Sequence, residues 1–111
     1  MNKVGVAKDF HPYPGGRFPR HGEGNGETFR KVFLFPVLSV GQHLEVVFDD
    51  ASGFPASFLE EAFGGLVRDG LELSQIKKLL TISVTDPDND IYRDEAWQYV
   101  EDEALRSAGN Q

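Results

Sequence analysis

Apolar and polar residues follow two different rhythms along the chain, and these rhythms predict its secondary structure. Strands are predicted where β-branched and aromatic residues cluster or alternate with polar ones, over residues 3–10, 43–48 and 80–85. The run at 43–48 is nearly continuous in hydrophobicity and is followed by Asp49, which is typical of a central strand buried within a parallel sheet.

Helices are predicted where apolar residues recur every three or four positions. One begins near Glu27 and ends or kinks at Pro36, because a proline ring clashes with the carbonyl four residues back. The clearest helix covers residues 57–70 and stops at Gly70. Its apolar stripe consists of Phe58, Leu59, Ala62, Phe63, Leu66 and Val67.

Two further helices are predicted in the second half of the chain. A short one covers 73–80, with Ser74 as its N-cap, and a longer one covers 94–108. We expect residues 107–111 to fray at the C-terminus. The inward face of the longer helix is predicted to contain Ala96, Trp97, Val100, Ala104 and Leu105.

The segment 11–26 is dense in proline and glycine and predicts a long loop, of the kind that is often functional or mobile. The remaining elements alternate between strands and helices. This order predicts a single α/β domain over residues 1–111, a small sandwich with helices packed on a mixed or mostly parallel sheet.

The net charge of −7 narrows the range of partners. Nucleic-acid binders usually meet phosphates with a basic patch, so the charge argues against nucleic acid and, equally, against an anionic membrane surface. A basic surface on another protein is the natural partner of an acidic chain.

The chain contains no cysteine, which excludes disulfides, thiol catalysis and cysteine-based zinc sites. Its first ten residues are too polar for a signal peptide, and no apolar run approaches the roughly 18 residues of a membrane-spanning helix. We therefore expect a cytoplasmic protein.

Asp49 and Asp50 follow the predicted central strand, at the edge of an open α/β sheet where ligands gather. Paired acids there would hold Mg²⁺ or accept a phosphoryl group. They are equally typical of a simple turn, because aspartate favours turns, and no third acid or lysine signature completes a phosphoacceptor pocket.

Ser57 precedes the clearest helix, and Glu60 follows it by three residues, which is the pattern of a capping box. A phosphate on Ser57 would also be stabilised by the free amides and positive dipole of the helix N-terminus. The sequence therefore supports both a plain cap and a phosphorylation site, and Ser52 is a second hydroxyl in the same loop.

Arg17 and Arg20 stand in the glycine-rich loop, where they would grip an anion or remain solvated charges. The loop lacks both the lysine ending of a P-loop and the glycine spacing of a dinucleotide site. No metal or cofactor is expected. The three histidines lack metal-ligand spacing, and the acids at 86, 88 and 90 lack the glycine and glutamate that complete a calcium loop.

The segment 43–67 resembles the core of the STAS-like family, a bacterial relative of the STAS domains. It carries an apolar strand before Asp49, a glycine in the next turn (Gly53), Ser57 followed by Phe58, and the helical sequence EEAFGGLV. The sequences PGGR at 14–17 and GETFRKVFLFPVL at 26–38 are also similar to that family.

This resemblance implies a regulatory module without enzymatic activity. STAS domains include anti-sigma factor antagonists, in which a GHKL-type kinase phosphorylates a serine or threonine at the start of the helix after the central strand. Ser57 is nearest to that position, although the acid before and the glycine after the antagonists' serine are absent here. The expected docking face comprises Asp49, Asp50, Ser52, Gly53, Phe54, Phe58, Glu60 and Glu61.

An alternative function also follows from the residues alone. Asp49 and Asp50, together with Arg17 and Arg20, would suit a small domain that binds or hydrolyses a phosphorylated ligand. The sequence leaves the pathway, the partner and the oligomeric state open.

Overall fold

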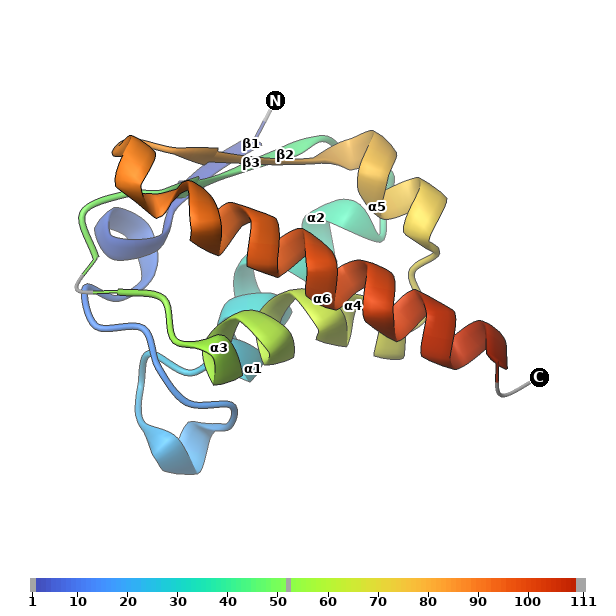
Figure 1. The fold of residues 1–111 in the computed structure, drawn as a ribbon, viewed down its shortest axis with the longest axis horizontal. Helices are drawn as coiled ribbons and strands as arrows, with labels where there is room; N and C mark the ends of the chain where they lie inside the picture. Colours follow the sequence, from blue (N-terminus) through green and yellow to red (C-terminus); the bar gives the residue numbers. More distant parts are fainter. Residues whose placement is uncertain (1, 52, 110–111) are drawn as a thin grey trace.

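A computed structural model describes residues 2–51 and 53–109 of the chain. Its centre is a parallel sheet in the order β1 (Asn2–Gly5), β2 (Leu44–Phe48) and β3 (Leu80–Val84) (Figure 1). The predicted α/β class, the three strands and the central place of β2 are thus confirmed, and the described sheet is wholly parallel.

The sheet is covered on one face. All the labelled helices lie on the same side of the sheet in Figure 1. Along β2 the side chains of Leu44, Val46 and Phe48 are buried, whereas Glu45 and Val47 are half-buried and point to the opposite face. The near-continuous hydrophobicity of this strand therefore does not reflect full burial on both of its faces.

The first strand is shorter than predicted, because the chain leaves the sheet after Gly5 and enters a π-helical turn, η1 (Val6–Phe10). Two carboxylates hold the turn in place. Asp9 accepts a hydrogen bond of 2.7 Å from the Gly5 amide, and Asp49 accepts bonds of 2.7 and 3.0 Å from the amides of Ala7 and Lys8.

The predicted loop contains one short 3₁₀ turn, η2 (Pro19–His21), and leads into a helix over residues 26–38. Asn25 caps this helix by accepting a 2.8 Å hydrogen bond from the Thr28 amide. Pro36 does not end the helix, but the predicted irregularity is present, because the backbone widens into a π-helical turn just before the proline. The segments are α1 (Gly26–Phe29), η3 (Arg30–Leu34) and α2 (Phe35–Leu38).

The clearest predicted helix is present over residues 56–68 and also contains a π-helical turn. Its segments are α3 (Ala56–Leu59), η4 (Glu60–Gly64) and α4 (Gly65–Arg68). Gly70 ends this region as predicted, with a φ of 108° that side-chain-bearing residues rarely adopt.

The remaining helices are α5 (Leu73–Leu79) and α6 (Asp90–Gly109), which follows a short 3₁₀ turn, η5 (Pro87–Asn89). Helix α6 begins four residues earlier than predicted, and residues 107–109 belong to it rather than to a frayed tail. Ser74 is not a cap, because α5 begins one residue before it with Glu72 at the N-cap. The predicted inward face of α6 loses Leu105, whose side chain is 74% exposed.

The core lies between the covered face of the sheet and the helices, and aromatic rings dominate it. Phe29 packs against Phe58 and Phe63 at centroid distances of 5.7 and 6.5 Å, and Phe63 packs against Phe48 of β2 at 5.9 Å. The rings of the two long helical segments therefore pack on each other, and Phe63 joins them to the central strand.

Candidate functional site

Two glycines on or beside the helix at 56–68 stand where a side chain would meet a close neighbour. A Cβ atom on Gly26 would come within 2.7 Å of the Phe58 carbonyl oxygen, and one on Gly64 within 2.8 Å of a Glu60 carboxylate oxygen. Glycine inside a helix costs about 1 kcal/mol relative to alanine. Gly26 therefore allows α1 to approach the helix at 56–68, and Gly64 leaves room for the Glu60 carboxylate of its own helix.

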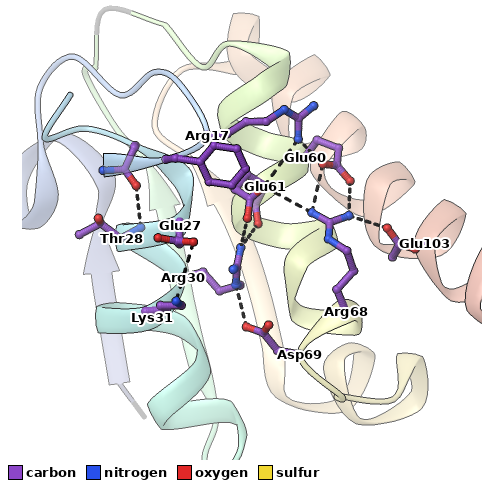
Figure 2. A network of polar contacts seen from close by, with 12 residues as sticks. Arg17, Glu27, Thr28, Arg30, Lys31, Glu60, Glu61, Arg68, Asp69 and Glu103 are labelled. Carbon is purple, nitrogen blue, oxygen red and sulfur yellow. Dashed lines mark hydrogen bonds and ion pairs between the residues drawn. The ribbon is translucent and has the colours of Figure 1, made fainter. Parts of the chain in front are cut away.

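A buried arginine joins the two long helical segments. Arg30 donates to the Glu61 carbonyl and lies 2.8 Å from the Glu61 carboxylate and 2.8 Å from that of Asp69 (Figure 2). Its guanidinium occupies the space beside Gly65, where any side chain would collide with it. Both glycines of the helical sequence EEAFGGLV therefore make room for charged neighbours.

Glu60 is the centre of a second group of ion pairs. It accepts hydrogen bonds from Arg17 in the glycine-rich loop and, at 2.7 Å, from Arg68 one helical segment later. Arg68 also donates to Glu103 of α6, so the pairs run from the loop across the central helix to α6 (Figure 2).

The ion pairs around Glu60 and Arg68 shift the pKa values of both side chains. Burial alone would raise the pKa of Glu60, but the hydrogen bonds and positive charges of Arg68 and Arg17 outweigh it, so the pKa lies below its ordinary value. The hydrogen bond with Glu60 likewise raises the pKa of Arg68 above its already high value. Both side chains are therefore charged throughout the physiological pH range.

Ser57 does not cap the helix, which begins one residue earlier with Pro55 at the N-cap. It is the second helical residue, it is half-buried, and its hydroxyl makes no hydrogen bond to any described residue. Glu60, the expected partner in a capping box, is occupied by Arg17 and Arg68. The capping-box prediction was therefore wrong.

The two loop arginines have different surroundings. Arg17 is held by Glu60, with Glu61 at 3.7 Å, so its charge is already balanced. Arg20 is exposed and lies over the ring of Phe18, 4.7 Å from its centroid. The structure does not bring the two arginines together as an anion grip.

The two adjacent aspartates at the end of β2 also have different surroundings. Asp49 turns its carboxylate to the amides of Ala7 and Lys8, where it fixes the turn after β1. Asp50 is exposed. Ser52, the second hydroxyl of this loop, lies outside the described residues.

Burial divides the expected docking face. Phe54 and Phe58 are 2% and 0% exposed, and Phe54 stacks on Phe48 at a centroid distance of 4.5 Å. Glu61 is also buried, against Arg30. These three side chains lie beneath the surface. Asp50 is exposed, and Gly53 and Ser57 are half-buried and retain contact with solvent.

Residues 25–90 match the family described as a STAS-like domain of unknown function (DUF4325), and this segment is more than half of the chain. The chain belongs to this family. No curated protein and no solved structure matches it significantly. The matched segment of this STAS-like domain contains β2, β3 and both partners of the Arg30–Glu61 pair.

Sequence reasoning missed four side chains of this STAS-like domain's ion-pair groups, namely Arg30, Arg68, Asp69 and Glu103. A signal for the first was available. Arg30 lies four residues before Leu34 and therefore on the apolar face of its predicted helix, and two helix-interior glycines at 64 and 65 indicate close packing. Arg68 and Glu103 carry no comparable local signal.

No three metal-ligating side chains gather anywhere in the described part of the STAS-like domain. In the segment 86–90, the Asp86 carboxylate instead accepts a 3.0 Å hydrogen bond from the Asp88 amide, as the turn interpretation predicts. None of the described helices is long and apolar enough to cross a membrane.

Proposed function

We propose that this STAS-like domain is a regulatory protein–protein interaction module without enzymatic activity. Its partner is a GHKL-type ATPase of the anti-sigma kind, and phosphorylation of Ser57 switches the interaction. The docking face is the solvent-exposed start of the helix at 56–68, with the loop that precedes it.

The observation that carries this proposal is the position of Ser57. The residue is half-buried, and its hydroxyl makes no hydrogen bond to any described residue, which supports access for a kinase. At the second helical position, a phosphate would meet free backbone amides and the positive end of the helix dipole.

The surrounding charges suggest how a phosphate would act. Glu60 and Glu61 lie one helical turn after Ser57, and Arg17 contacts both of them. Phosphorylation adds about 1.5 to 2 negative charges at neutral pH, which would repel the two glutamates and compete for Arg17. The loop that contains Arg17 and the start of the helix at 56–68 would then change conformation together.

The absence of enzymatic activity is supported by how the polar groups are used. Asp49 accepts hydrogen bonds from backbone amides, and Arg17 forms ion pairs with two glutamates. The strand end and the loop therefore do not combine into one reactive centre. The alternative of a ligand-binding or hydrolytic site built from these residues therefore loses its support.

The proposal is tested by incubating the protein with a purified GHKL-type anti-sigma kinase and ATP, followed by mass spectrometry. We expect one phosphate, on Ser57. Ser74 is a matched control, because it is also the second residue of a helix and is exposed. Phosphate on Ser74 alone, or on neither serine, contradicts the switch.

The affinity of the protein for the kinase provides an independent test, with variants of the same two serines. Ser57→Asp should weaken the complex with the kinase by at least about tenfold, a change of about 1.4 kcal/mol. Ser57→Ala and Ser74→Asp should bind as the parent protein does. Equal affinities for all four proteins would overturn the proposal.

A further inference from the structure

The uncovered face of the sheet is hollowed near the carboxyl ends of its strands. A cavity of about 390 Å³ opens there, within the range of small-molecule sites. Its lining comes from all three strand segments and from the turn after β1. The lining residues are Lys3, Gly5, Lys8, Asp9, Val47, Asp49 and Thr85.

The alternation of side chains along parallel strands explains the shape of the hollow. Lys3 and Gly5 in β1 are in register with Glu45 and Val47 in β2, whose side chains point to the uncovered face. Gly5 contributes no side chain, and the Asp49 carboxylate fills the space that its Cβ would occupy, so Val47 supplies the apolar floor of the hollow. The turn η1 forms a wall at the carboxyl edge of the sheet.

The acidic and basic side chains around the hollow differ in whether they have hydrogen-bonded or charged partners. Asp9 and Asp49 accept three hydrogen bonds of 2.7 to 3.0 Å from backbone amides, which partly neutralise their carboxylates. Lys3 and Lys8 are exposed and form no ion pair with any described residue. Two uncommitted ammonium groups at one cavity stand out in a chain with a net charge of −7.

We infer that this hollow binds a small phosphorylated molecule. The phosphate lies between Lys3 and Lys8, whose ammonium groups donate charge-assisted hydrogen bonds. The organic part of the ligand rests on Val47, and Thr85, whose hydroxyl donates to the Phe48 carbonyl at 3.5 Å, forms the rim. This site is on the sheet face and is independent of the proposed switch at Ser57.

The experiment is a titration of the ¹⁵N-labelled protein with phenyl phosphate, followed through the backbone amide resonances. We expect saturable shifts concentrated at Gly5, Lys8, Val47 and Thr85. The double variant Lys3→Gln/Lys8→Gln should bind at least about tenfold more weakly, because each charge-assisted hydrogen bond is among the stronger polar contacts.

A matched control removes the same charge elsewhere. Lys77→Gln/Lys78→Gln lies on α5 and should bind phenyl phosphate like the parent protein. All four lysines are exposed, so both variants should fold. Shifts spread over the whole surface, or equal weakening by the two double variants, would show non-specific charge attraction and overturn the site.

Two further ligands separate the phosphate from the organic part. Inorganic phosphate should shift the same resonances with several-fold weaker affinity, and phenol alone should leave them unchanged. Binding of phenol as tight as that of phenyl phosphate would overturn the role of the lysines. Equal affinities for inorganic phosphate and phenyl phosphate would overturn the role of Val47.

Discussion

The two faces of the sheet treat charge in opposite ways. In the helical layer, each buried charged side chain has an oppositely charged partner, as Arg30 has in Glu61 and Asp69. On the uncovered face, Lys3 and Lys8 stand beside a cavity without an ion pair to any described residue. Charges in the helical layer hold elements together, whereas those on the uncovered face are available to a ligand.

The largest expected effect comes from breaking the helical layer at Arg30. Arg30→Met leaves the buried Glu61 carboxylate without its closest partner, and the free energy of unfolding should fall by about 3 kcal/mol in urea denaturation. Lys31→Met removes the same charge one residue later. Its partner Glu27 is 3.8 Å away at the surface, so the loss should be below about 0.5 kcal/mol. Similar losses for both variants would contradict the structural role of Arg30.

Substitutions of two neighbouring valines of β2 compare the contributions of the two faces to the free energy of unfolding. Val46 is fully buried toward the helices, and Val47 is half-buried on the other face. Val46→Ala should lower the free energy of unfolding by about 2 kcal/mol through lost burial and a cavity. Val47→Ala should cost less than about 1 kcal/mol. If the two losses were equal, the second face would be covered in solution.

The smallest effect is a dependence on pH. Because the folded pKa of Glu60 is below its ordinary value near 4.5, ionised Glu60 stabilises the fold fully at neutral pH. This contribution disappears as the pH falls through the folded pKa. Glu60→Gln should therefore cost about 1 kcal/mol at pH 7 and progressively less below pH ~4.

Denaturation curves between pH 3 and pH 7 measure this difference. Glu23→Gln is the control, because Glu23 is an exposed carboxylate without an ion pair to any described residue. Its cost should stay small at every pH. A cost of Glu60→Gln that does not change with pH would argue against a lowered pKa.

Hydrophobic rhythm was sufficient to predict the elements of the fold and their order. The β-branched runs at 43–48 and 80–85 became β2 and β3, and the stripe from Phe58 to Val67 became the central helix. These signals are strong because burial of a continuous apolar surface decides them. Details that rest on a single residue were less predictable.

Ser57 shows why such details fail. Its spacing from Glu60 satisfies a capping box, but Pro55 starts the helix earlier, and two distant arginines take the glutamate. Arg17 is 43 residues away from Glu60 in the sequence. A local pattern cannot include partners that the tertiary fold brings together, and the same reason hid the pair of Arg30 and Glu61.

The strand order places this domain in relation to much larger folds. Each crossover adds the next strand in the same direction, and parallel crossovers are almost always right-handed, so both put their helices on one face. Eight such steps close a (β/α)₈ barrel, in which the bare face turns inward and the carboxyl ends of the strands bear the active site. The two crossovers of this domain cannot close a barrel. This domain therefore presents to solvent the surface that a barrel would enclose, and its hollow between Lys3 and Thr85 lies at the corresponding edge.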